Sequence, residues 1–268
     1  MKCFVINLEK DIARRNNMQN LLSKQSINFE FVDAVYGKNI PKDELYKYYD
    51  ENKAKREAIG GGLTISEIGC AMSHLKAYQT MISQNLPYSL ILEDDVLIGC
   101  EFKDILLDIE NVLKKSHFLD VILLGGDNFW YTKWGATNIY HKYNIVKTHH
   151  DVWYAYSYII TQEAARKMID KITPIFTVID HWDYYNRKGW CNVYAVVPNV
   201  VIPSSDSLLS NIENERLSEK KYRKHSILER FYHKIIYNLF YKPIIRRLLR
   251  VIYRLKQNNK NNYYNGID

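Results

Sequence analysis

The sequence predicts an α/β protein in which helices pack against a central sheet. Short apolar runs with the composition of buried strands stand at residues 2–8 and 88–93. Stretches with helical periodicity, at 11–25 and 64–84, alternate with them along the chain. Because alternating strands and helices build helix-covered sheets, we expect ligands to bind beyond the carboxyl ends of the strands.

The predicted strands are short apolar or alternating segments that end at turn-forming residues. The first, KCFVINL, has the character of a buried strand, and the second alternates until it reaches Gly37. In chain order the predicted strands are 2–8, 28–37, 88–93, 119–126, 153–161 and 192–203.

The predicted helices lie between these strands, and the N-terminus of the second, at 64–84, is the best defined by the sequence. Three glycines precede Thr64 and Ser66, either of which can serve as the N-cap. The polar stretch Lys38–Glu57 is predicted as a loop with a short helix. In chain order the predicted helices are 11–25, 64–84, 101–116 and 162–172.

Charge divides the 268-residue chain into a body and a tail. Residues 218–268 hold 13 Lys/Arg against 3 Asp/Glu, whereas residues 1–217 hold 24 against 27. The body is therefore slightly acidic, which argues against nucleic-acid binding, and the basic excess belongs to the tail. We predict a catalytic or binding domain at 1–217 and a separate unit at 218–268.

The tail has apolar residues at steps of three and four, with Lys and Arg between them, on both sides of Pro243. This pattern predicts two basic amphipathic helices hinged at the proline. They either dock on the body or on another subunit of a homo-oligomer, or they lie on an anionic membrane surface.

Other features point to the cytoplasm. The four cysteines are scattered and form no Cys-x-x-Cys pair, which is typical of reduced thiols. The N-terminal apolar stretch is too short for a signal peptide, and no segment approaches the about 20 apolar residues of a membrane span.

Three consecutive carboxylates, Glu93, Asp94 and Asp95, follow the predicted strand 88–93 directly. Adjacent carboxylates repel one another unless a cation lies between them, and hard oxygen ligands suit Mg²⁺ or Mn²⁺. Since alternate residues of a strand share a face, we expect Glu93 and Asp95 to bind one ion while Asp94 points elsewhere. A solvated acidic strand end is the structural alternative.

The chain resembles glycosyltransferase family 25, the bacterial lipooligosaccharide transferases related to collagen galactosyltransferases. The resemblance rests on FVINLEKDIARR (4–15), FEFVDAVYGK (29–38), SEIGCAMSHLKAY (66–78) and LILEDDV (90–96). Looser matches follow at 154–169 and 178–185, where Val178 stands in place of the family's usual proline.

The resemblance implies a GT-A-like nucleotide-sugar fold, a UDP-sugar donor with galactose as the commonest sugar, and inversion at the sugar carbon. Glu93 and Asp95 then stand where such folds place their Asp-x-Asp motif for metal and diphosphate. Asp94 is interpreted as a structural or donor-contacting residue.

Further donor contacts are expected from two blocks. Asn7, at the end of the first strand, could bind a uracil edge, and Arg14 and Arg15 could reach phosphate, although a solvated helix face explains the arginines equally well. Ser73 and His74 could face the nucleotide, or could belong to a buried, hydrogen-bonded helix; His74 is also a weaker candidate metal ligand.

An inverting transfer needs one base for the acceptor hydroxyl. Asp180 is the first candidate because His181, Trp182 and Tyr184 resemble a platform for a sugar, while helix capping is its structural alternative. Asp127 is the second candidate and Asp183 the third.

Together these features predict a divalent-metal-assisted transferase. It moves a sugar, with galactose favoured, from a UDP-sugar to a lipid-linked lipooligosaccharide acceptor at the inner face of the cytoplasmic membrane. Two rivals are an Mg²⁺-dependent phosphotransfer or receiver-type domain and a non-catalytic membrane-surface scaffold.

Overall fold

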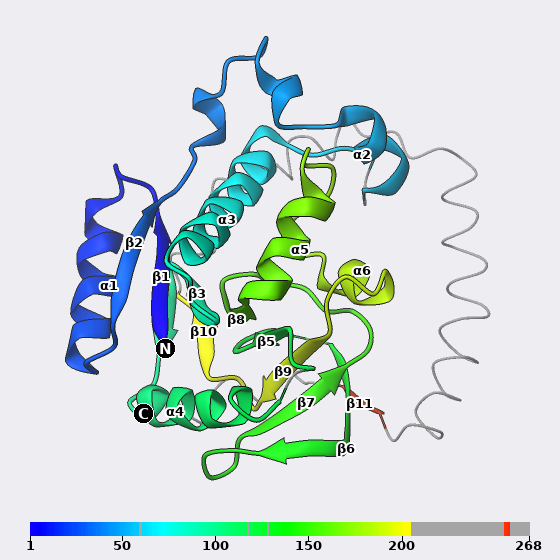
Figure 1. Cartoon of the computed structure of the whole chain (residues 1–268). Coiled ribbons are helices and arrows are strands. Elements are labelled where there is room, and N and C mark those ends of the chain that lie inside the picture. The colour runs from blue at the N-terminus through cyan, green and yellow to red at the C-terminus, as the bar shows by residue number, and fades with distance from the viewer. Residues whose placement is uncertain (59–60, 117, 128, 205–254, 258–268) are drawn as a thin grey trace.

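A mixed sheet covered by helices on both faces forms the body of the protein (Figure 1). The computed structural model describes residues 1–58, 61–116, 118–127, 129–204 and 255–257. Within them, nine strands pair in the order β11-β6-β7-β9-β5-β8-β3-β1-β2. This architecture confirms the predicted α/β fold class.

Strand direction reverses twice in the middle of the sheet, once on each side of β8. Strands β2, β1 and β3 run parallel, β8 is antiparallel to both β3 and β5, and β9 is parallel to β5. The carboxyl ends of β3 and β5 therefore lie at the same edge, on either side of β8. These strands span Lys2–Asn7 (β1), Phe29–Asp33 (β2), Tyr88–Glu93 (β3), Val121–Leu123 (β5), Ser157–Thr161 (β8) and Val193–Val197 (β9).

Helices cover each face of the sheet and close two cores. Along β1, Phe4 and Ile6 pack beneath α3 and α5, whereas Cys3 and Val5 face α1 and α4. This alternation follows from the two-residue period of a strand. The helices are α1 (Ile12–Lys24), α2 (Glu51–Glu57), α3 (Ile65–Ser83), α4 (Phe102–Leu113), α5 (Gln162–Ile172) and α6 (Trp182–Arg187), with 3₁₀ turns at Gly37–Asn39 and Leu45–Lys47.

Four predicted strands differ from the structure, one being 119–126, which is a strand only over Val121–Leu123. The segment 28–37 is a strand only to Asp33, and 153–161 only from Ser157. The segment 192–203 is two strands, because β9 belongs to the large sheet while β10 (Val201–Pro203) pairs with β4 (Val96–Ile98). The hairpin of β6 (Trp130–Asn138) and β7 (Asn144–Thr148) was not predicted.

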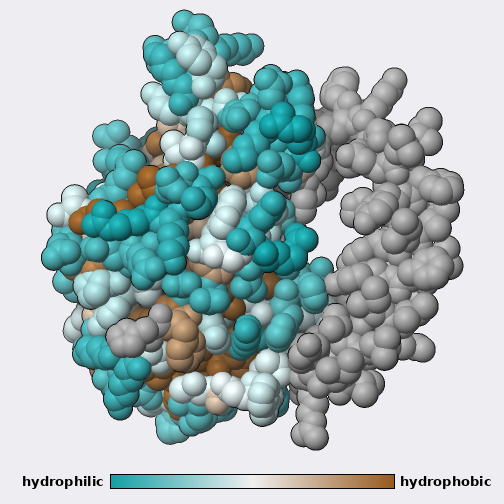
Figure 2. Space-filling view, turned by 45° about the vertical axis from the view of Figure 1, so that its right-hand side comes forward, coloured by the Kyte–Doolittle hydropathy of each residue, from teal (hydrophilic) through white to brown (hydrophobic). Residues whose placement is uncertain are grey.

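The predicted helical tail, residues 218–268, lies outside the described residues except for β11 (Leu255–Gln257). These three residues pair antiparallel with Trp130–Thr132 of β6. In the part of the chain that the structure covers, no helix combines the length and the apolar content needed to cross a bilayer. Most of the described surface in Figure 2 is hydrophilic, with small apolar patches between the polar side chains.

Candidate active site at the carboxyl ends of β1 and β3

A pocket of about 290 Å³ opens where β1, β2 and β3 end and α3 begins. It lies beyond the carboxyl ends of parallel strands, which is where ligands bind in sheets of this kind. Its walls come from the end of β1, the start of α1, the loop after β2, the first turns of α3 and the acidic turn after β3. The lining residues are Ile6, Leu8, Asp11, Arg14, Ala34, Val35, Tyr36, Gly37, Ser66, Cys70, Ser73, His74, Glu93, Asp94 and Asp95.

All three consecutive carboxylates face this pocket. Strand β3 ends at Glu93, and Asp94 and Asp95 form a turn before β4 begins. The turn is held from both sides, because Glu93 N donates to the Tyr156 carbonyl (2.9 Å) and Ser204 N donates to the Asp95 carbonyl (2.8 Å). Asp94 lines the pocket beside Glu93 and Asp95, although Asn7 holds its Oδ2, so the expectation that it points away from a bound ion stays a prediction.

The acidic turn carries more negative charge than its neighbours neutralise. Burial, together with the charges of Glu93 and Asp94, raises the pKa of Asp95 to about 7. Burial also raises the pKa of Asp94, although Asn7 and Arg14 oppose it. Raised pKa values show that these neighbouring carboxylates are unfavourable in their charged form. A divalent cation, which prefers hard oxygen ligands, would stabilise the charged form by its own positive charge. Glu93 and Asp95 would hold it.

Arg14 places a positive charge against this turn. Its Nη1 contacts Asp94 Oδ1 at 3.2 Å and Asp95 Oδ2 at 3.4 Å, while the side chain lines the pocket. Arg15 points away from the pocket lining: its guanidinium lies over the Phe31 ring at 4.2 Å and contacts Asp33 at 3.5 Å. Both arginines were predicted to reach phosphate, but only Arg14 lines the pocket.

Asn7 lies behind the pocket wall rather than in it. Its side chain is 1 % exposed, and its Nδ2 donates to Asp94 Oδ2 at 2.6 Å. Its Oδ1 accepts a bond from Arg15 Nη1 at 3.4 Å. Both ends of the amide are therefore engaged within the protein, so the contacts support a role in holding Asp94 rather than in reading a base.

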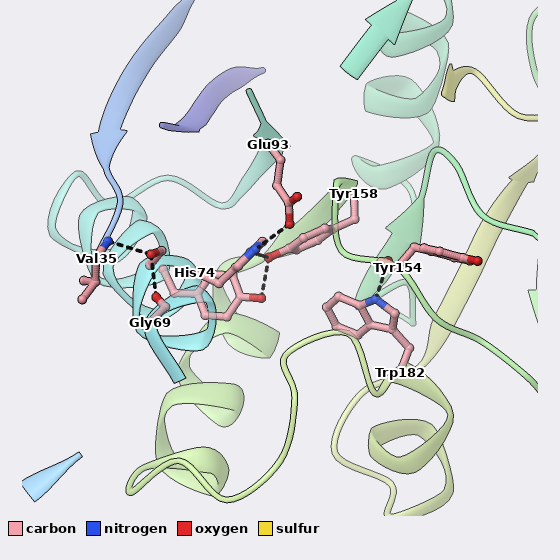
Figure 3. Close-up of polar contacts among 9 residues, drawn as sticks. Val35, Gly69, His74, Glu93, Tyr154, Tyr158 and Trp182 are labelled. Carbon is pink, nitrogen blue, oxygen red and sulfur yellow. Dashed lines mark hydrogen bonds and ion pairs between the residues drawn. The ribbon is translucent and has the colours of Figure 1, made fainter. Parts of the chain in front are cut away.

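Helix α3 brings Ser73 and His74 to the opposite wall. Thr64 is its N-cap and forms a capping box with Glu67, which fixes where the helix starts. A Cβ on Gly69 would come within 2.7 Å of Val35 O and Gly37 N, so glycine allows the helix to lie directly against the loop after β2. The Ser73 hydroxyl joins these two segments, accepting from Val35 N (2.8 Å) and donating to Gly69 O (2.7 Å) (Figure 3).

His74 is fully buried and bridges α3 to two strands. Its Nδ1 is 2.7 Å from the Tyr158 hydroxyl and its Nε2 is 3.4 Å from Glu93 Oε1 (Figure 3). Tyr158 in turn bonds the Tyr78 hydroxyl at 2.6 Å. Cys70 joins this group, because one ligand atom from each of Cys70, His74 and Glu93 lies within 4.8 Å of the others. Sequence reasoning missed Cys70, although its spacing of four residues from His74 places both on one helix face.

The three candidate bases lie outside the lining of this pocket. Asp127 follows β5, and its Oδ1 is buried with no hydrogen-bond partner in the described structure. Asp180 lies one residue before His181, which is the N-cap of α6. Asp180 therefore does not have the helix-capping role that was its structural alternative. Asp183 pairs with Arg187 at 3.2 Å, and burial raises its pKa.

The aromatic residues beside Asp180 form a core rather than an open platform. Trp182 is 0 % exposed, and its indole N–H donates to the Tyr154 carbonyl at 2.9 Å (Figure 3). His181 is also buried and stacks on Trp153 with ring centres 4.7 Å apart. The expectation of a sugar platform at His181, Trp182 and Tyr184 was therefore wrong, since the rings' faces are covered.

Comparison with known proteins shows that residues 1–182 match glycosyltransferase family 25, described as an LPS biosynthesis protein. The lipooligosaccharide biosynthesis protein lic2B of Haemophilus influenzae is 29 % identical, and the match covers 94 % of each chain. Procollagen galactosyltransferase 2 of Mus musculus is 26 % identical over 83 % of this chain, but this is only 40 % of its own length. The crystal structure of a glycosyltransferase involved in glycosylation of the major capsid of PBCV-1 superposes with a TM-score of 0.31, at 10 % identity, over 62 % of each chain.

Proposed function

Since the chain belongs to glycosyltransferase family 25, we propose that it transfers galactose from UDP-galactose to a growing lipooligosaccharide, with inversion at the sugar carbon. Two relatives support the choice of substrates: one is described by its role in lipooligosaccharide biosynthesis, and the other as a galactosyltransferase. The observation that carries the site is the pocket whose wall is formed by Glu93, Asp94 and Asp95.

The pocket offers the charges that a nucleoside diphosphate needs. Glu93 and Asp95 would hold Mn²⁺ or Mg²⁺, which when bound neutralises charge on the leaving diphosphate. Arg14 lies at the same turn and can donate to a phosphate oxygen if it exchanges its weak contacts with Asp94 and Asp95. Asn7 keeps Asp94 in place through its 2.6 Å bond.

A second group must accept the proton of the attacking hydroxyl. Asp127 is best supported by the structure, because β5 ends at the same sheet edge as β3 and only β8 separates them. With strands about 4.8 Å apart, their ends are about 10 Å apart, which leaves room for a donor sugar and an acceptor hydroxyl. Its Oδ1 is buried with no hydrogen-bond partner in the described structure, so its capacity to accept a hydrogen bond is unused there. Asp180 and Asp183 are the alternatives.

The membrane part of the proposal concerns the tail. An acceptor that grows on a lipid lies at the membrane, and 13 Lys/Arg against 3 Asp/Glu in residues 218–268 suit the anionic inner face of the cytoplasmic membrane. This would keep the enzyme peripheral at that face of the membrane.

A panel of UDP-sugars tests the proposal against its rivals. We expect UDP-galactose to be hydrolysed slowly without acceptor, faster with Mn²⁺ than with chelator, and faster than UDP-glucose or UDP-N-acetylglucosamine. A phosphotransfer domain predicts no preference among the sugars, and a scaffold predicts no hydrolysis of any of them. Transfer from UDP-galactose to lipooligosaccharide, read by mass spectrometry of the product, then tests the acceptor.

A further inference from the structure

We propose that Cys70, His74 and Glu93 form a binding site for a thiophilic divalent cation such as Zn²⁺, distinct from the ion assigned to Glu93 and Asp95 but sharing the Glu93 carboxylate with it. The three residues offer one sulfur, one nitrogen and one oxygen ligand, all within 4.8 Å of one another. This donor set suits Zn²⁺, which binds thiolate, imidazole and carboxylate, better than it suits Mg²⁺.

The distance between His74 and Glu93 supports an ion between them. Their Nε2 and Oε1 atoms are 3.4 Å apart. A charge-assisted hydrogen bond would be about 2.7–2.9 Å long. In a tetrahedral zinc site with Zn–N and Zn–O bonds of about 2.0–2.1 Å, two ligand atoms are about 3.3 Å apart. The observed separation therefore matches the edge of a metal tetrahedron more closely than a strong hydrogen bond.

The surroundings of His74 resemble those of a metal-bound histidine. Such a histidine usually has its second nitrogen hydrogen-bonded, which fixes the ring and its tautomer. Here Nδ1 lies 2.7 Å from the Tyr158 hydroxyl, and Tyr158 is itself held by Tyr78 at 2.6 Å. With Nδ1 protonated and donating to Tyr158, Nε2 presents its lone pair toward Glu93 and Cys70.

The position of the group leaves a coordination site open. Cys70, His74 and Glu93 all line the pocket, so a fourth ligand can come from water or from a bound molecule. Three protein ligands with one open position are typical of zinc sites that exchange ligands. Binding converts the Cys70 thiol to a thiolate and releases its proton to solvent, so affinity should rise with pH.

Cobalt provides a direct probe, because Co²⁺ takes the place of Zn²⁺ and a cobalt–thiolate bond absorbs strongly in the near ultraviolet. The full-length protein is titrated with Co²⁺ under reducing conditions and without nucleotide. We expect the thiolate band and intense visible bands of a tetrahedral site, both abolished by added Zn²⁺. Absence of the thiolate band from the wild-type protein would overturn the proposal, whatever the variants do.

Matched variants locate the ion. Cys70→Ser should remove the thiolate band, and Cys100→Ser, at an exposed cysteine, should keep it. Tyr158→Phe should weaken cobalt binding about tenfold while the band remains, as expected for a group that orients a ligand. A band that survives in C70S or disappears in C100S would contradict the assignment.

A further variant separates this site from the proposed nucleotide–metal site. Asp95→Asn should keep the cobalt–thiolate band, because Asp95 does not belong to the group, whereas loss of the band would place the ion at the acidic turn. Since nucleotide is absent from the titration, failure of UDP-galactose hydrolysis would count against the proposed function and not against this site. Glu93→Gln should retain the band with weaker affinity, and circular dichroism confirms that each variant is folded.

Discussion

The side-chain amide of Asn7 donates to the Asp94 carboxylate at 2.6 Å, and this bond joins the end of β1 to the acidic turn after β3. Both residues are buried, with exposed fractions of 1 % and 9 %. The contact explains how a turn with three adjacent carboxylates keeps one shape: Asn7 binds Asp94 from behind while Arg14 contacts Asp94 and Asp95 from the pocket side.

Asn7→Ala should destabilise the protein because it leaves Oδ2 of the buried Asp94 carboxylate without its donor, while Arg14 still contacts Oδ1. We expect a loss of about 1–3 kcal/mol in the free energy of unfolding at pH 7, measured by urea denaturation. Asn17→Ala, at an exposed position of α1, is the control and should change stability by less than about 0.5 kcal/mol. Equal effects of the two substitutions would show that the Asn7–Asp94 bond contributes nothing.

Gly69→Ala tests the close approach of α3 to the loop after β2. In a helix without close neighbours, replacing glycine by alanine stabilises by about 1 kcal/mol. Here the new Cβ meets backbone atoms at 2.7 Å, which cannot move as a flexible side chain can, so we expect a loss of about 1–3 kcal/mol instead. Thermal unfolding measures the change in stability. A lower melting temperature supports the close approach of α3 to the loop, whereas a higher one contradicts it.

The buried histidines should make the protein less stable in acid. Burial, and then the charge of Arg187, lowers the pKa of His181 to about 4, from 6.5 in the unfolded chain. The unfolded state therefore binds the proton first, so stability is intact above pH 6.5 and is lost as the pH falls toward 4. The loss from His181 is about 3 kcal/mol at most.

Burial lowers the pKa of His149 to about 4 as well, so His181→Phe should remove only part of this pH dependence. Urea unfolding between pH 7 and 4.5 measures the slope. His141→Gln, at an exposed ring, should leave the slope unchanged. A His181→Phe variant with the full wild-type slope would show that His181 is not buried in its neutral form.

Removal of residues 218–268 tests the proposed role of the tail. We expect the truncated protein to lose binding to vesicles of anionic phospholipid and to retain metal-dependent UDP binding. Vesicles of neutral phosphatidylcholine are the control and should bind neither form. Because β11 pairs with β6, loss of UDP binding together with a lowered melting temperature would favour a tail that docks on the body.

Sequence patterns predicted the elements that are determined locally. Strand β1 is a continuous apolar run, α3 begins at a capping box, and α5 spans the predicted 162–172. These signals lie within a few residues of one another, so the chain alone reveals them. The acidic residues at the end of β3 were located for the same reason.

Features set by distant contacts were not predicted. The turn at Asp94 and Asp95 depends on bonds from Tyr156 and Ser204, which lie far along the chain. Trp182 was interpreted as a sugar contact because an aromatic residue beside an acid is consistent with either a platform or a core. Trp182 is buried against Tyr158, with ring centres 5.0 Å apart. This contact joins residues distant in the sequence, so the local sequence pattern does not predict it.

Calorimetric titration of UDP into the protein with Mn²⁺ tests the central claim most directly, with Asp95→Asn as the variant and Asp104→Asn, at an exposed site of α4, as its control. The substitution keeps the shape of the side chain while removing a charge from the turn. We predict that the wild-type and D104N proteins bind UDP only when Mn²⁺ is present, and that D95N loses at least tenfold in affinity while remaining folded. Equal UDP affinity of D95N and wild type in Mn²⁺ would contradict the assignment of this pocket.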